Sequence, residues 1–221
     1  MSPRSAAANQ VSNELAIVHA DAHCIVVCKP SGLLAVPGRG EAGRDCLSER
    51  VRVEYTDALI VHRLDMATSG LMLLARGADA QRTLSIAFAQ REVHKRYVAV
   101  AAGQMSAREG EIDLPLSADW PNRPRQQVDT LRGRPSLTRY RTLGIDAARN
   151  TTRVELEPVT GRAHQLRVHL LALGHPILGD ALYGSAEVQA AAPRLLLHAS
   201  SLRFAHPASG EPMSFDSPPP F

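Results

Sequence analysis

Three short stretches of the sequence concentrate polar side chains that could carry chemistry. In residues 61–70, VHRLDMATSG, Asp65 precedes a turn of small residues and an apolar run. A carboxylate there is held rigidly and can act as a base or nucleophile, although an Asp in such a place also suits a turn. Residues 158–169, PVTGRAHQLRVH, form the second stretch. The third is residues 94–100, HKRYVAV, where Tyr97 is placed either for chemistry or at the edge of a core.

Metal ligation is one alternative use of these side chains. A metal-dependent hydrolase would have to draw its ligands from His62, Asp65, His164 and His169. His164 and His169 are about 140° apart around a helix, so they cannot bind one ion from a single helical face. No third ligand stands at a fixed spacing from His62 and Asp65. We therefore predict a site without a metal.

The hydrophobic pattern predicts the elements that must position these side chains. The run LMLLA at 71–75 is typical of a strand buried on both faces. After Asp79, predicted as an N-cap, apolar residues recur at three- and four-residue steps, which indicates an amphipathic helix. Strands and helices are mixed without strict alternation, and this favours an α+β fold with a mixed, mostly antiparallel central sheet flanked by helices and loops. The other predicted strands are 15–19, 24–28, 96–102, 137–143, 153–157, 196–204 and 212–215, with a further helix at 46–55.

Another helix is predicted over 163–173, inside the second polar stretch. Thr160 or Gly161 is expected to start it. Steps of three and four residues place Arg162, Gln165 and His169 on one side of this helix. Arg167 lies apart from that side.

Length and composition bound the domain organisation and the compartment. The chain has 221 residues, 44% of them hydrophobic, which suits one globular domain over 14–221. Residues 1–13 are small and polar and are predicted to form a flexible tail. No run approaches the roughly 18 apolar residues of a membrane span, and the N-terminus lacks the apolar segment of a signal peptide. Three cysteines without a paired CxxC motif predict a reducing, cytoplasmic setting, and we expect a monomer.

The positive charge is unevenly distributed along the chain. Of the 25 basic residues 23 are Arg, a bias that fits either codon usage in a GC-rich genome or phosphate recognition. Residues 120–141 hold six Arg and one acid, whereas the rest of the chain has 19 basic residues and 21 acids. Prolines and a glycine make part of this stretch a loop. Such a basic stretch is either an ordinary exposed loop or the footprint of a nucleic-acid partner. We expect the partner, with Arg123 and Arg125 in contact with it.

Taken together, the three stretches resemble the RluA-type pseudouridine synthases. The matching segments are VHRLDMATSGLMLLAR, HKRYVAV and VTGRAHQLRVHLLALGHPILGDALYG, in that order. CIVVCKPSGLLAVPG and RLLLHASSLRFAHPASGEPMSF also look like that family, so the resemblance covers about 14–217. It implies the pseudouridine synthase fold with a catalytic cleft, and isomerisation of a uridine in structured RNA by base flipping, cleavage and re-attachment at C5. It also implies that no cofactor is needed.

Within the family, the short length and the segment DWPNRPRQ look closest to a dual-specificity member that acts on 23S ribosomal RNA and on the tRNA anticodon stem-loop. Many relatives carry an S4-like RNA-binding domain ahead of the catalytic one. This sequence offers no room for it, so we expect the catalytic domain itself to bind RNA. A degenerate, purely RNA-binding relative would lack at least one of Asp65, Tyr97 and Arg167, and all three are present.

The resemblance also assigns roles to individual residues. Asp65 is implied to be the catalytic carboxylate, acting on an oxocarbenium-like sugar either as a nucleophile or as a base. Arg167 is implied to keep it ionised, and Tyr97 to stack on the uracil and take part in the loss of the C5 proton. Arg63 is implied to fill the gap that the flipped nucleotide leaves in the RNA stack. Lesser roles, in shaping the pocket, supporting Arg167 or contacting RNA, fall to His62, Thr68, Arg162, His164 and Gln165.

Overall fold

The computed structural model describes residues 15–38 and 40–221. The predicted flexible tail, residues 1–13, lies outside this range. Within the described ranges, no helix is long and apolar enough to cross a membrane.

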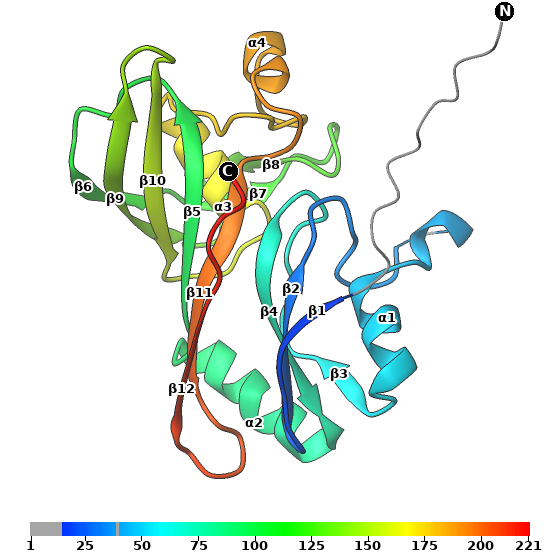
Figure 1. Ribbon diagram of the computed structural model, residues 1–221. Helices are drawn as coiled ribbons and strands as arrows, with labels where there is room; N and C mark the ends of the chain where they lie inside the picture. The colour runs from blue at the N-terminus through cyan, green and yellow to red at the C-terminus, as the bar shows by residue number, and fades with distance from the viewer. Residues whose placement is uncertain (1–14, 39) are drawn as a thin grey trace, which may run out of the picture.

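One large sheet forms the centre of the molecule (Figure 1). Its main strand order is β1-β2-β4-β11-β5-β10-β9-β6, with β12 paired to β11 and β3 to β4. Among the pairings between described strands, β4 with β11 is parallel and the others are antiparallel. This confirms the predicted α+β class. The strands are β1 (Ala16–Ala20), β2 (Cys24–Lys29), β3 (Ala58–Ile60), β4 (Ser69–Arg76), β5 (His94–Ala102), β6 (Glu109–Asp113), β9 (Leu137–Asp146), β10 (Thr151–Pro158), β11 (Leu197–Ala205) and β12 (Pro212–Asp216).

Helices and a small second sheet cover the central sheet. Figure 1 shows α1 (Leu47–Glu54) and α2 (Gly77–Gln90) beside the β1–β4 half of the sheet. Helix α3 (Gln165–Ala172) packs against β8, β9 and β10. The second sheet pairs β7 (Leu116–Ala118) with β8 (Gln126–Val128), and the short elements α4 (Ala186–Ala190) and a 3₁₀ turn (Glu41–Gly43) complete the fold.

Strand β4 separates two apolar cores, as the run LMLLA predicted. Met72 and Leu74 belong to the larger core, which also contains residues of β5, β10 and α3. Leu71, Leu73 and Ala75 face the smaller core beneath α2. Because each large apolar side chain buried this way stabilises the fold by about 1.5–3 kcal/mol, β4 is held firmly on both faces. The loop that ends at β4 is therefore attached to a strand that is packed on both faces.

Gly70 explains how β4 and β11 come so close. Its φ is +114°, and a Cβ there would overlap the backbone of Ala199 on β11. A side chain at this position would force the parallel pair apart. Gly70, the last of the small residues that follow Asp65, thus permits the pairing of β4 with β11.

Two helix starts differ from the sequence predictions. Asp79 lies in the first turn of α2, which begins at Gly77, so it is not the N-cap. Helix α3 begins at Gln165 rather than at Thr160 or Gly161. The reason is that the Gln165 side-chain oxygen accepts hydrogen bonds from the Thr160 hydroxyl and the Arg162 amide, which holds the preceding segment in a turn.

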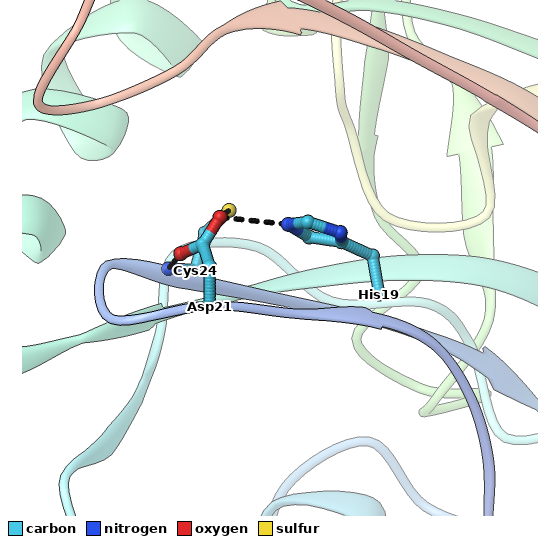
Figure 2. Close-up of side chains that lie close together, drawn as sticks. All are labelled: His19, Asp21 and Cys24. Atoms are coloured by element: carbon cyan, nitrogen blue, oxygen red, sulfur yellow. Dashed lines mark hydrogen bonds and ion pairs between the residues drawn. The ribbon is translucent and has the colours of Figure 1, made fainter.

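The turn between β1 and β2 is built around Asp21 (Figure 2). One carboxylate oxygen accepts the backbone amides of His23 and Cys24, and the other accepts from His19 Nε2 at 2.7 Å. Burial opposes ionisation, but these hydrogen bonds outweigh it and lower the pKa of Asp21. His19, Asp21 and Cys24 are the one trio in the described ranges that could offer a metal three ligands. None of them lines the cleft described next.

Candidate active site

A cleft of about 520 Å³ lies where the loop before β4, the end of α2, strand β5 and the segment before α3 meet. It brings together residues from all three stretches that the sequence singled out. Asp65 is the one carboxylate among its lining residues. The lining also includes Tyr97 and a set of basic side chains: His62, Arg63, Arg91, Lys95, Arg162, His164 and Arg167.

The loop that carries Asp65 is held in place by hydrogen bonds from Lys29 and Ser31. The ammonium group of Lys29, fully buried, donates hydrogen bonds to the carbonyls of Leu33, Pro30 and Met66. The Ser31 hydroxyl donates to the carbonyl of Ala67 at 2.7 Å. Burial lowers the pKa of Lys29 to about 8, against the opposing attraction of Asp65. The carboxylate is therefore held in place as the turn of small residues predicted.

Arg167 is buried and lies between two carboxylates. Its Nη1 donates to Asp65 at 3.4 Å, while Nε and Nη2 donate to Asp180 at 2.8 and 2.7 Å. The side chain of Asp180 is 1% exposed, so this is a buried, bidentate pair. Burial alone would lower the pKa of Arg167, but the hydrogen bonds with Asp180 and the charges of both carboxylates raise it. Asp180 thus fixes the guanidinium with one edge directed at Asp65.

His164 also lies close to the Asp65 carboxylate. Its backbone has a φ of +54°, and the ring lies with Nε2 3.9 Å from the Asp65 carboxylate. The Tyr183 hydroxyl accepts the Gln126 amide and shares a hydrogen bond of 2.7 Å with His164 Nδ1. In the tautomer in which this hydroxyl donates to Nδ1, the neutral ring carries its own proton on Nε2, the nitrogen nearer Asp65. Burial lowers the pKa of His164 and favours this neutral form.

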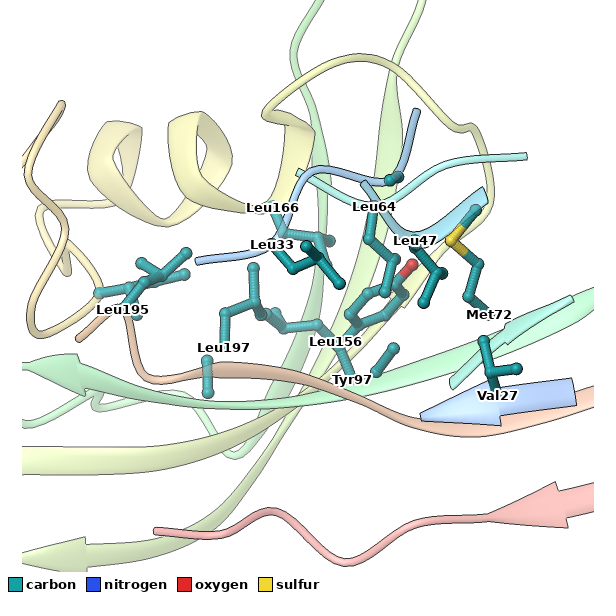
Figure 3. Packing of buried hydrophobic residues seen from close by; sticks show 14 of the residues in the cluster. Val27, Leu33, Leu47, Leu64, Met72, Tyr97, Leu156, Leu166, Leu195 and Leu197 are labelled. Atoms are coloured by element: carbon teal, nitrogen blue, oxygen red, sulfur yellow. The ribbon is translucent and has the colours of Figure 1, made fainter. Parts of the chain in front are cut away.

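Tyr97 forms part of the cleft floor. Figure 3 shows its ring among Leu64, Leu156 and Leu166, and the residue is 9% exposed. Burial, helped by the charge of Asp65, raises the pKa of Tyr97. At neutral pH its side chain is a phenol, which can stack and donate a hydrogen bond but is a poor base.

Three of the predicted RNA contacts are engaged within the protein. Gln165 is buried, and its amide nitrogen donates to the Leu137 carbonyl and the Thr138 hydroxyl while its oxygen is used as described above. No part of that amide is left for RNA, which corrects the prediction. His62 Nε2 accepts the Leu73 amide at 2.9 Å, Thr68 is buried, and both residues line the cleft.

The predicted basic loop is divided by the structure. Arg123 stacks on Trp120, with its guanidinium 3.0 Å from the ring centroid, and Arg125 lies over the ring of Tyr183. Arg139 and Arg141 are instead part of β9, where they form ion pairs with Glu111 and Glu155.

On the far side of the sheet from the cleft, arginines are therefore paired with carboxylates. Arg96 also reaches Glu155, at 3.8 Å, and side chains alternate along β5, so Arg96 points away from the cleft that Tyr97 lines. We call this surface the back face and define it by Arg96, Glu111, Arg139, Arg141 and Glu155. Ion pairs within the protein therefore offset the charges of two of the six arginines of residues 120–141.

The remaining predicted residues stay at the cleft. Arg63 is exposed there, and Arg162 is half-buried with Nε donating to the Pro135 carbonyl at 3.4 Å. Asp180 and Tyr183 were missed, although both lie in the segment HPILGDALYG that carried part of the resemblance. The motifs therefore hold a second carboxylate, Asp180, besides Asp65. Asp180 is nevertheless too enclosed to activate water, because Arg167 and backbone amides use both of its oxygens.

Comparison with known proteins identifies the family to which this chain belongs. The family model described as RNA pseudouridylate synthase matches residues 23–172, and the chain belongs to that family. It is thus an isomerase that converts uridine to pseudouridine in RNA, which confirms the predicted fold and activity.

Individual relatives agree. The chain is 53% identical to the dual-specificity RNA pseudouridine synthase RluA of Escherichia coli (strain K12), over 94% of both chains. It is 50% identical to the protein of the same name from Pasteurella multocida, again over 94% of both. Among solved structures, human RNA pseudouridylate synthase domain containing 1 aligns with a TM-score of 0.79 and 30% identity, over 100% of this chain and 87% of that one.

Proposed function

We propose that this chain forms pseudouridine in both 23S ribosomal RNA and the anticodon stem-loop of tRNA. The identity of 53% to a dual-specificity synthase supports this, as does the segment DWPNRPRQ, which folds into the β7–β8 connection beside the cleft. One observation carries the chemistry: Asp65, the single carboxylate of the cleft lining, lies 3.4 Å from a buried guanidinium.

Asp65 is proposed as the catalytic carboxylate. Breaking the bond between uracil and ribose develops positive charge at C1′, and an ionised carboxylate can stabilise that charge, trap it, or remove a proton from the sugar. Arg167 supplies the positive neighbour that keeps Asp65 ionised in an enclosed site. Asp180 holds Arg167 so that it does not have to reorganise when the substrate binds.

Tyr97 is proposed to stack against the flipped uracil. Its ring is fixed by the surrounding leucines, and it lies close enough to Asp65 for that charge to raise the pKa of the phenol. A neutral phenol suits stacking and hydrogen bonding to the base. If Tyr97 removes the C5 proton, binding of the substrate must first lower that pKa.

Arg63 is proposed to enter the RNA stack in place of the flipped nucleotide. It is exposed at the cleft, in the loop that also carries Asp65, and its planar guanidinium can stack where a base has left. Arg123 and Arg125 are proposed to bind the RNA backbone next to the cleft, since Tyr183 links Arg125 to His164. The enzyme is proposed to work in the cytoplasm as a monomer, without a metal or cofactor.

Mapping pseudouridines in a strain that lacks the gene tests the choice of RNA. Carbodiimide adducts and primer extension on 23S rRNA and tRNA should show a stop in each RNA that disappears in the deletion strain and returns with the wild-type gene. Loss of a stop in just one class of RNA would contradict dual specificity. Unchanged stops in both classes would contradict both proposed substrates.

A further inference from the structure

The end of the cleft formed by α2 and β5 has no role in the chemistry described so far. Phe88, Arg91 and Lys95 line it. Lys95 and Tyr97 are two residues apart on β5, so their side chains share a face and their Cα atoms are about 7 Å apart. This end therefore lies beside the proposed uracil position, at the distance of a neighbouring nucleotide.

Lys95 is a half-buried cation without an anion. Among the described residues, no carboxylate lies within ion-pair distance of its ammonium group. The ammonium group instead lies 5.5 Å from the centroid of the Phe88 ring. Arg96, the next residue of the same strand, has its carboxylate partner on the back face. Within one strand, then, Arg96 has a carboxylate partner and Lys95 has none among the described residues.

The side chains beside Lys95 in the cleft are held in place by contacts within the protein. The Phe88 ring stacks on His62 with 4.6 Å between centroids and an angle of 27° between planes. His62 is in turn anchored by the Leu73 amide on β4. Since His62 and Lys95 both lie against Phe88, its ring supports the ammonium group rather than offering an open platform for a base.

The electrostatics favour an incoming anion at this end. Burial lowers the pKa of Lys95, because the charged form loses part of its hydration. Arg91 adds a second cation to the same wall, at the left-handed residue that ends α2. Binding a phosphate would restore a partner to both.

We propose that Lys95, assisted by Arg91, binds the backbone phosphate of the nucleotide next to the target uridine. The inference rests on the proposed function, because it takes the RNA to enter the cleft with its uracil on Tyr97. It adds a phosphate subsite that fixes the backbone on one side of the flipped nucleotide, so that the base and sugar are aligned with Asp65.

Salt-dependent RNA binding tests the subsite. We would measure affinity for an anticodon stem-loop in the Asp65→Asn background, with Lys95→Met as the variant, because Met keeps an apolar stem against Phe88. We expect about a ten-fold loss of affinity and a fall of about 0.7 to 1 in the salt slope. Arg96→Met, the matched control on the back face, should leave the slope unchanged. An unchanged slope in a folded Lys95→Met protein would overturn the proposal.

A modified RNA identifies which phosphate is contacted. Because the protein is unchanged in this experiment, misfolding of a variant cannot explain the result. In wild-type protein, a single neutral methylphosphonate at one of the two linkages that flank the target should reproduce the loss, and Lys95→Met should lose nothing further from it. Lys95→Arg should restore binding. Indifference of the wild type to both linkages would overturn the proposal whatever the variant does. Wild-type protein that binds the stem-loop but forms no pseudouridine would contradict the proposed substrate and leave the Lys95 comparison readable.

Discussion

The cleft and the back face use the same kinds of side chain in opposite ways. Arg96, Arg139 and Arg141 on the back face are each ion-paired with Glu111 or Glu155. In the cleft, by contrast, Arg63, Arg91, Lys95 and Arg162 form no ion pair with any described residue, and Asp65 is the single carboxylate of the lining. The cleft therefore keeps a surplus of unpaired positive charge, whereas each of these back-face arginines has a carboxylate partner. A count of Arg in the sequence cannot separate these two surfaces, but the fold does.

The largest expected effect is the loss of turnover on removing the one acidic charge of the cleft. Asp65→Asn should lower kcat for pseudouridine formation by more than about a thousand-fold, because no other carboxylate lines the cleft. Affinity for RNA should stay the same or rise, since a negative charge has been removed from a surface that binds phosphates. Release of tritium from C5-labelled uridine in RNA measures the rate. Glu155→Gln on the back face is the control and should leave turnover unchanged; strong turnover by Asp65→Asn would sink the assignment.

The next effect tests how Arg167 is held. Asp180→Asn leaves the guanidinium buried with Asp65 as its single charged partner. We expect the free energy of unfolding to fall by about 3 kcal/mol and kcat to fall by up to about a hundred-fold. Chemical denaturation and single-turnover kinetics measure the two. Glu155→Gln removes the more exposed ion pairs with Arg96 and Arg141 and should cost about 1 kcal/mol or less. Equal losses in the two variants would contradict the difference between cleft and back face.

A smaller effect concerns acid stability at the cleft wall. Burial lowers the pKa of His62 from 6.5 to about 3, so between these values the unfolded chain binds a proton that the folded protein does not. Stability should therefore fall as the pH drops below 6.5, by at most about 1.4 kcal/mol per pH unit from this residue. His62→Gln can still accept the Leu73 amide and should flatten that part of the curve. Burial also lowers the pKa of His198, to about 4, so some slope should remain. Identical urea midpoints for both proteins from pH 7 to pH 4 would rule out this role of His62.

Much of the fold was predictable because its signals are local. The buried strand at 71–75, the helix at 46–55 and the alternating strands follow from patterns within a few residues. The start of α3 did not follow, because the side chain of Gln165 reaches back to hold Thr160 and Arg162 in a turn. Short strands such as β7 and β8 carry too few residues for a periodic signal.

The candidate site was predictable where the family motifs coincide with it. The motifs named Asp65 and Arg167, and the fold brings these residues, 102 positions apart in the chain, within 3.4 Å. Asp180 was missed because a single Asp in a Gly-rich segment has the same pattern as a turn residue. Lys95 was missed because its significance lies in a partner that is absent, and pairing of charges depends on strand register. For the same reason the pairing of Arg139 and Arg141 could not be anticipated.

The central claim is that RNA binds the cleft and the β7–β8 connection rather than the back face. Two double variants of the same basic stretch test it most directly: Arg123→Gln with Arg125→Gln, and Arg139→Gln with Arg141→Gln. The salt dependence of binding to an anticodon stem-loop should flatten by about 1.5 to 2 in the first pair and stay unchanged in the second. An unchanged slope in the first pair, or an equal reduction in both, would contradict the claim.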